Sequence, residues 1–221
     1  MKIVVVMVAS HQNEEFQRTI DSLRTSNLDI KIYGQGESFF FVKKLKYAAK
    51  AAEELVEYTH ILFVDAFDIL FIGDEVQIEE RVKQLGNHDF ICSTEKACWP
   101  DPELDSQYPL LGFSPWCYLN SGSYIARREY LVELFKKEKI EDLKVLAVDD
   151  QLWLTQLYLK DPEKVIKLDT QCVLFQSVAF LAEGEFSTEG KFKNNITGEY
   201  PIILHGNGRT DLSPYLHLVK R

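Results

Sequence analysis

The 221-residue sequence has no apolar run long enough to cross a membrane. The longest run near the N-terminus covers residues 3–9, follows the single Lys2, and precedes no small-residue cleavage site. It fits neither a membrane-spanning helix nor a signal peptide, and instead suits a buried strand. The chain also lacks internal repeats, Gly/Ser-rich or proline-rich linkers and blocks of like charge. We therefore expect one domain over residues 1–221.

Cysteine is scarce, with four residues and no CxxC pair: Cys92, Cys98, Cys117 and Cys172. Four thiols in a chain of this length do not resemble a disulfide framework, and their spacing does not suit a metal site. The sequence predicts reduced, mostly buried thiols. It favours a cytoplasmic location, or the secretory pathway if a leader has been removed.

Positive charge is also in deficit, with 25 Lys and Arg against 34 Asp and Glu, a net charge of −9 and a pI near 5.1. An acidic surface repels phosphate backbones, so binding to nucleic acid or to an anionic membrane is not expected. A phosphorylated small ligand would need a cation as intermediary.

The familiar phosphate-binding and hydrolase motifs are absent. The segment Gly34-Gln35-Gly36-Glu37 lacks the third glycine of GxGxxG, and there is no Walker sequence, GxSxG, HExxH or EF-hand loop. A nucleotide held through the backbone amides of such a loop is therefore disfavoured.

Apolar residues make up 46% of the chain, and short apolar runs alternate with helical periodicity. This alternation predicts an α/β fold. Strands are expected at Ile3–Val8, Ile30–Tyr33, Ile61–Val64, Phe90–Cys92, Tyr118–Ala126, Val165–Leu168 and Ile202–Leu204. Helices are expected at Asn13–Arg24, Val42–Tyr58, Val76–Leu85, Arg127–Lys137, Asp150–Leu159 and Leu212–Val219, with a loop from Trp99 to about Pro115.

Two carboxylates, Asp65 and Asp68, follow the apolar strand Ile61–Val64. Ligands of open α/β sheets bind beyond the carboxyl ends of the strands, where these acids would lie. A divalent cation such as Mg²⁺ or Mn²⁺ would join the two carboxylates and hold a diphosphate. The alternative is a turn residue and a helix cap.

His205 ends a second apolar strand and precedes Gly206-Asn207-Gly208, whose glycines permit close backbone approach to a ligand. A lone histidine is more often structural, but an imidazole beside two carboxylates would favour Mn²⁺ over Mg²⁺. The other four histidines stand in no comparable context.

Two further polar clusters are weaker indicators. Asp149-Asp150-Gln151 opens an expected helix, where acids also serve as N-caps, and at most one of two adjacent residues can face a reacting centre squarely. Residues 118–123, which include Asn120, place small polar groups on a strand or a bend.

Taken together and in this order, these clusters resemble the glycosyltransferase domain of the procollagen lysyl hydroxylase/glycosyltransferase family. The resemblance runs nearly end to end. It rests on Val8-Ala9-Ser10, Gly34-Gln35-Gly36-Glu37, Phe63-Val64-Asp65-Ala66-Phe67-Asp68, Cys98-Trp99-Pro100 with Gln107-Tyr108-Pro109, Leu119-Asn120-Ser121-Gly122, Asp149-Asp150-Gln151-Leu152, Phe175-Gln176 and His205-Gly206-Asn207-Gly208.

The resemblance implies a GT-A fold, with a Rossmann-like nucleotide-binding half (1–95) and an acceptor half (96–221) on one continuous mixed sheet. It implies a metal-dependent transferase that moves glucose or galactose from UDP-glucose or UDP-galactose to a hydroxyl acceptor. The acceptor would be hydroxylysine or galactosyl-hydroxylysine of a collagen-like polypeptide. Asp65, Asp68 and His205 would ligate Mn²⁺, with Mg²⁺ as a substitute.

The resemblance also assigns residues to the two substrates. Around the nucleotide and its phosphates it places Ser10, Phe39, Phe67, Gly206, Asn207, Gly208 and Arg209. Around the donor sugar and the acceptor hydroxyl, as candidate catalytic residues, it places Trp99, Asn120, Asp149, Asp150 and Gln151.

The chain departs from the family pattern before the long helix. Phe39 stands where the family has tryptophan, and Phe39-Phe40-Phe41 replaces a glycine-rich loop. Lys43 and Lys44 fall out of register with the family lysine. After Gly208 the family's Pro-Thr-Lys becomes Arg209-Thr210-Asp211, so Arg209 would supply the missing positive charge.

Three other functions remain open on the sequence. The chain could be a transferase with a lipid or glycan acceptor, or a catalytically silent UDP-sugar-binding module. A nucleotidyltransferase is less compatible, because no basic loop is available for a triphosphate. Intact Asp65, Asp68, Asp149, Asp150 and His205 argue against the silent module.

Overall fold

The computed structural model describes residues 1–109, 114–144 and 148–219. Its α-helices are α1 (Glu14–Leu23), α2 (Val42–Glu54), α3 (Glu75–Gln84), α4 (Arg128–Lys137) and α5 (Asp150–Lys160). Its strands are β1 (Ile3–Val8), β2 (Asp29–Tyr33), β3 (His60–Val64), β4 (Ile69–Phe71), β5 (Phe90–Glu95), β6 (Tyr118–Arg127), β7 (Lys167–Leu168), β8 (Phe175–Ser177), β9 (Phe186–Ser187), β10 (Lys193–Asn194) and β11 (Ile203–His205). The predicted α/β alternation is confirmed.

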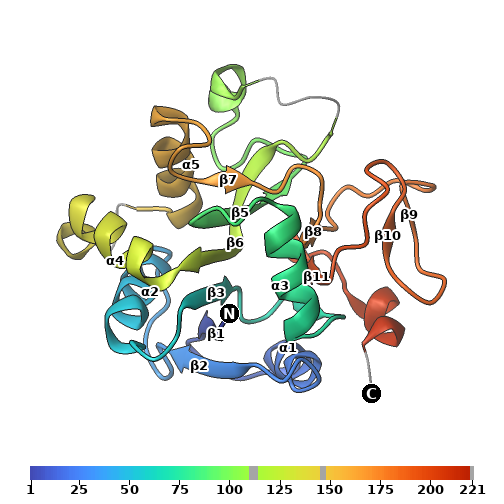
Figure 1. The fold of residues 1–221 in the computed structure, drawn as a ribbon, viewed down its shortest axis with the longest axis horizontal. Helices are drawn as coiled ribbons and strands as arrows, with labels where there is room; N and C mark the ends of the chain where they lie inside the picture. The colour runs from blue at the N-terminus through green and yellow to red at the C-terminus, as the bar shows by residue number, and fades with distance from the viewer. Residues whose placement is uncertain (110–113, 145–147, 220–221) are drawn as a thin grey trace.

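Six strands form a mixed central sheet in the order β2-β1-β3-β6-β5-β7 (Figure 1). β1 pairs in parallel with β2 and β3, whereas β6 runs antiparallel to β3 and β5. Helices cover both faces of the sheet. Successive side chains of β1 are all apolar and point to opposite faces, so both faces need a cover. Val4 and Val6 pack into a core shared with α2, α4 and α5, and Val5 and Met7 pack into a core shared with α1 and α3.

The prediction of one continuous sheet needs a correction. β4, β11 and β8 form a separate three-stranded sheet, and β9 and β10 form a two-stranded one. β11 pairs antiparallel with β4 on one edge and parallel with β8 on the other. Because both edges of β11 are occupied, it has no edge left to join the central sheet.

Several predicted boundaries also shift. The helix expected to reach Tyr58 ends at Glu54, although Leu55 and Tyr58 stay buried, so the apolar pattern outlasts the helix. β5 continues past Cys92 to Glu95, and the last predicted helix is a 3₁₀ helix, Ser213–Leu218. Residues 110–113 of the expected loop lie outside the described residues.

The four cysteines are unpaired; Cys92 and Cys172 are buried, whereas Cys98 and Cys117 are partly exposed, so half of the thiols rather than most are buried. Within the described ranges, no helix combines the length and apolar composition that a bilayer crossing requires.

Candidate active site

The loop between β3 and β4 brings Asp65 and Asp68 next to His205, the last residue of β11. The Asp65 amide donates to the Gly122 carbonyl of β6 at 2.7 Å, and the Gly206 amide donates to the Asp68 carbonyl at 2.8 Å. These two backbone hydrogen bonds tie the carboxylate loop to the central sheet on one side and to β11 on the other. The meeting point of the two sheets therefore positions the triad.

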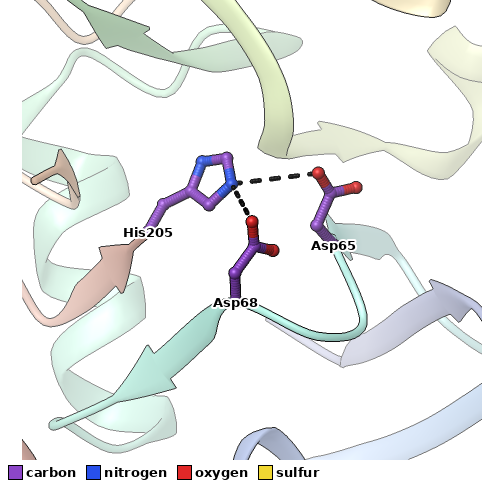
Figure 2. Close-up of side chains that lie close together, drawn as sticks. All are labelled: Asp65, Asp68 and His205. Carbon is purple, nitrogen blue, oxygen red and sulfur yellow. Dashed lines mark ion pairs between the residues drawn. The ribbon is translucent and has the colours of Figure 1, made fainter. Parts of the chain in front are cut away.

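The side chains of the triad converge, as Figure 2 shows. His205 Nε2 lies 3.4 Å from Asp68 Oδ2 and 3.8 Å from Asp65 Oδ2. One ligand atom from each of Asp65, Asp68 and His205 lies within 4.8 Å of the others. The histidine side chain is 4% exposed, whereas the two carboxylates are 27% and 32% exposed and open toward solvent.

This donor set fits a divalent metal ion. Two carboxylate oxygens and one imidazole nitrogen suit Mn²⁺ better than an all-oxygen ion such as Mg²⁺. The other ring nitrogen of His205, Nδ1, is buried and has no hydrogen-bond partner within the described chain. The helix-cap alternative for Asp68 is wrong, because Asp68 precedes strand β4, and the N-cap of α3 is Asp74.

Lys44 of α2 is the buried cation of the site. Its Nζ lies 2.8 Å from Asp65 Oδ1 and 2.9 Å from Asp150 Oδ2, and its side chain is 8% exposed. Lys44 was not predicted as a site residue, because it is out of register with the family lysine. The structure nevertheless places it between two predicted site residues, Asp65 and Asp150. Lys43 points elsewhere, to Glu37 at 2.6 Å.

The charges of the cluster shift one another's pKa values. Burial alone would lower the pKa of Lys44, but the Asp150 and Asp65 carboxylates outweigh it and raise the pKa. Burial raises the pKa of Asp65. His205 overcomes the burial of Asp68 and lowers that carboxyl's pKa, while Asp68 raises the pKa of His205 despite burial.

Gly122 leaves room for the His205 ring. A Cβ added at Gly122 would lie 2.8 Å from both ring nitrogens of His205, a distance that real Cβ atoms essentially never show. The glycine of the Asn120-Ser121-Gly122 motif is therefore explained by close approach to a candidate metal ligand.

The two predicted acids at the start of α5 have different surroundings. Asp149 is the N-cap, and its side chain accepts a hydrogen bond from the Leu152 amide at 2.9 Å. Asp150 is buried and pairs with Lys44, so it joins the cluster that contains Asp65. Of the pair, Asp150 is the one that the structure brings to the triad.

The other predicted polar residues meet at Glu95, the last residue of β5. Its buried carboxylate accepts hydrogen bonds from Asn120 Nδ2 at 3.0 Å, Gln151 Nε2 at 2.6 Å and Asn207 Nδ2 at 2.8 Å. Gln151 Nε2 also donates to the Trp99 carbonyl at 3.0 Å. Glu95 thus fastens β6, α5 and the segment after His205 to one point.

A pocket of about 640 Å³ opens beside the triad. Its lining includes predicted nucleotide residues Ser10, Phe39, Phe67 and Arg209, together with Lys44, Asp65 and Asp68. His11 also lines it, and its ring stacks on Phe67 with centroids 4.8 Å apart. The lining of the pocket thus combines aromatic rings with charged residues of the cluster.

Gly206, Gly208 and Trp99 are among the predicted residues that do not line this pocket. Gly208 adopts a φ of +65°, and a Cβ at Gly206 would meet the Thr210 carbonyl, so both glycines serve the backbone path after His205. The Trp99 side chain is 61% exposed.

Lys44, Glu95 and His11 are the residues that sequence reasoning missed. Lys44 precedes Ala48 by four residues on the apolar stripe of its helix, which could have marked it as a buried cation. Glu95 lies just beyond the predicted end of its strand, and His11 directly follows the predicted site residue Ser10. These positions were only weak indications that Glu95 and His11 belong to the site.

The fold is shared with solved structures of glycosyltransferases. Solved structures with the same fold include a glycosyltransferase involved in glycosylation of the major capsid of PBCV-1 (TM-score 0.57, 11% identity, 98% of this chain and 99% of that one). An active-site mutant of LgtC matches with a TM-score of 0.53 and 14% identity over 92% of this chain and 87% of that one. The protein has the α/β fold with a mixed central sheet of GT-A glycosyltransferases.

The family follows from the sequence comparison. Residues 1–217 match the model of the PLOD GT domain, and the chain belongs to this glycosyltransferase family. Procollagen-lysine,2-oxoglutarate 5-dioxygenase of Drosophila melanogaster is 30% identical over 100% of this chain and 33% of its own length. The human multifunctional procollagen lysine hydroxylase and glycosyltransferase LH3 is 29% identical over 96% of this chain and 30% of its own length. The chain thus spans about a third of the length of these relatives.

Proposed function

We propose that this domain transfers glucose or galactose from a UDP-sugar to a hydroxyl acceptor with Mn²⁺ as its cofactor. The observation that carries the proposal is the convergence of Asp65, Asp68 and His205 beside an aromatic-lined pocket of about 640 Å³. In the reaction, the bond between the anomeric carbon and the UDP oxygen breaks, and a bond to the acceptor oxygen forms. UDP leaves with the electron pair of the broken bond, and the acceptor hydroxyl releases its proton to solvent.

Asp65, Asp68 and His205 would hold the metal, which when bound supplies Lewis-acid stabilisation of the departing diphosphate. The protein side chains would bind and orient the nucleotide. The rings of Phe67, His11 and Phe39 offer faces on which a nucleobase can stack, and Arg209 offers a positive charge at the pocket wall.

Lys44 holds the Asp65 and Asp150 carboxylates in fixed positions, so the site is organised before the donor arrives. The hydrogen bonds of Glu95 likewise fix Gln151, assigned to the donor sugar and acceptor hydroxyl, and Asn207, assigned to the phosphates. Catalysis would then depend on positioning rather than on a protein nucleophile.

The proposed acceptor is hydroxylysine or galactosyl-hydroxylysine in a collagen-like chain, supported by the names of the relatives. A lipid or glycan acceptor would use the same donor site. A catalytically silent UDP-sugar-binding module would keep the pocket and lose turnover.

A UDP-release screen tests the proposal. UDP-glucose, UDP-galactose, UDP-glucuronate and UDP-N-acetylhexosamines are each incubated with the protein, with and without Mn²⁺. Release that needs Mn²⁺, and that is abolished in Asp65→Ala and in Asp68→Ala, supports the transferase. Thermal stabilisation by UDP without release from any donor would instead favour the silent module.

A further inference from the structure

Phe180 is a large aromatic residue in an unfavourable backbone conformation on the surface. Its φ is +60°, and it is 73% exposed. Bulky side chains rarely occupy the left-handed region because it strains the backbone, and such positions cluster at functional sites. A phenyl ring that is both strained and exposed gains nothing from burial, so folding does not explain it.

The backbone around Phe180 is fixed to the candidate active site. The Val178 amide donates to the His205 carbonyl at 2.9 Å, and the Ala179 amide donates to Asn207 Oδ1 at 3.0 Å. The carbonyl of Phe180 itself accepts a hydrogen bond from Lys96 Nζ at 3.0 Å. Phe180 therefore follows a segment that is hydrogen-bonded to the candidate metal ligand His205 and to Asn207, two residues further along the chain.

The Glu95 network links Phe180 to the acceptor side. Asn207 donates to Glu95, as does Gln151, which also holds the carbonyl of exposed Trp99. Two exposed aromatic residues, Trp99 and Phe180, are thus anchored through one carboxylate. Neither lines the nucleotide pocket.

The charged groups beside Phe180 favour a sugar over an apolar peptide side chain as its ligand. Lys96, which holds its carbonyl, forms an ion pair with Glu185 and lies 4.8 Å from the Trp116 ring centroid. An apolar peptide side chain would need a continuous apolar surface. A sugar has one apolar face and a rim of hydroxyls, and it suits a single ring bordered by charged groups.

We propose that Phe180 is a specificity-determining residue that stacks against a sugar ring of the acceptor. The inference rests on the proposed glycosyl transfer and deepens it, because it names a saccharide-bearing acceptor rather than a bare amino-acid side chain.

Phe180→Gly gives a sharp test, because glycine removes the ring and relieves the positive φ together. Transfer is measured with methyl β-D-galactopyranoside and with a synthetic hydroxylysine peptide that carries no sugar. We expect the KM for the methyl galactoside to rise roughly five- to tenfold. Mn²⁺-dependent hydrolysis of the UDP-sugar and UDP affinity should stay unchanged, and the melting temperature should not fall.

Phe180→Ala should raise the same KM while keeping the strain, and Val56→Gly, at an exposed apolar residue of the turn after α2, should leave it unchanged. An unchanged KM in Phe180→Gly overturns the inference, and so does transfer by the wild type to the bare hydroxylysine peptide alone. If the wild type hydrolyses UDP-sugars and transfers to neither probe, the acceptor inference fails while the donor chemistry stands. No release from any donor would overturn the proposed function itself.

Discussion

The ammonium group of Lys44 lies 2.8 Å from an Asp65 carboxylate oxygen, and both groups face the same pocket. Asp150 completes the pairing at 2.9 Å. One lysine of α2 thus pairs with two acids from different elements, the loop between β3 and β4 and the first turn of α5. In a protein with a net charge of −9, this buried cation offsets part of the repulsion between the carboxylates of the site.

Replacement of this cation should therefore destabilise the fold. In Lys44→Met we expect the free energy of unfolding to fall by about 3 kcal/mol, because Asp65 and Asp150 lose their partner. Urea denaturation of the metal-free protein measures the change. The matched variant is Lys43→Met, whose solvent-exposed pair with Glu37 should contribute much less to stability. Equal losses in the two variants would contradict the account.

Gly122→Ala should weaken metal binding without altering a ligand. The new methyl group would displace the His205 ring, and we expect affinity for Mn²⁺ to fall roughly 10- to 100-fold, as for other changes that misplace a ligand. Isothermal titration with Mn²⁺ in the presence of UDP provides the measurement. Gly184→Ala introduces strain at a φ of +85° but has open space around it, so Mn²⁺ affinity should be retained there. Wild-type affinity in Gly122→Ala would refute the close-approach argument.

Glu95→Gln should disrupt the point where four segments meet. The introduced amide keeps one acceptor oxygen, but its NH2 would face either the Asn207 donor or the donors of Asn120 and Gln151, and we expect a loss of about 1–3 kcal/mol in unfolding free energy. UDP-sugar turnover should fall as well, because Asn207 and Gln151 lose their positions. Exposed Glu103→Gln serves as the control. Unchanged stability and turnover in Glu95→Gln would show that the network is dispensable.

Asp169 should give the protein a stability that declines with pH. Burial raises the pKa of this carboxyl from 3.8 to about 6, although the amides of Val173, Leu174 and Phe175 donate to it. The folded chain therefore binds the Asp169 proton more tightly than the unfolded chain. Its contribution is full below 3.8 and is lost as pH rises through about 6, a change of about 3 kcal/mol.

The measurement compares urea unfolding of the wild type and of Asp169→Asn between these pH values. The wild type should lose more stability over this window than the variant, whatever the variant's absolute stability. The exposed Asp21→Asn variant should follow the wild-type profile. Parallel profiles for the wild type and Asp169→Asn would rule out the raised pKa.

The triad was accessible from the sequence because each of its parts ends an apolar strand. Asp65 and Asp68 follow Ile61–Val64, and His205 follows a second apolar run, which marked each as a candidate; the resemblance to the family then joined the three in one metal site. The separate sheet that carries His205 was not accessible, since β4 and β8 have three residues each and no readable period.

Lys44 and Glu95 were harder to recognise for a different reason. A lysine on a helix and a glutamate at a strand end are ordinarily exposed, and only their tertiary partners make them buried. Asp149 and Asp150 are neighbours in the sequence with equal claims, and the helix geometry separated them into a cap and a partner of Lys44.

The central claim is that Asp65, Asp68 and His205 hold a metal ion that UDP-sugar turnover requires. UDP release is measured for the wild type and for Asp68→Ala after treatment with a chelator and again during a Mn²⁺ titration, with Asp89→Asn, far from the triad, as the control. Our account predicts that the chelator abolishes release, that Mn²⁺ restores it in the wild type and in Asp89→Asn, and that Asp68→Ala stays inactive. Release that persists in the chelator, or that Mn²⁺ restores to the wild-type rate in Asp68→Ala, would contradict it.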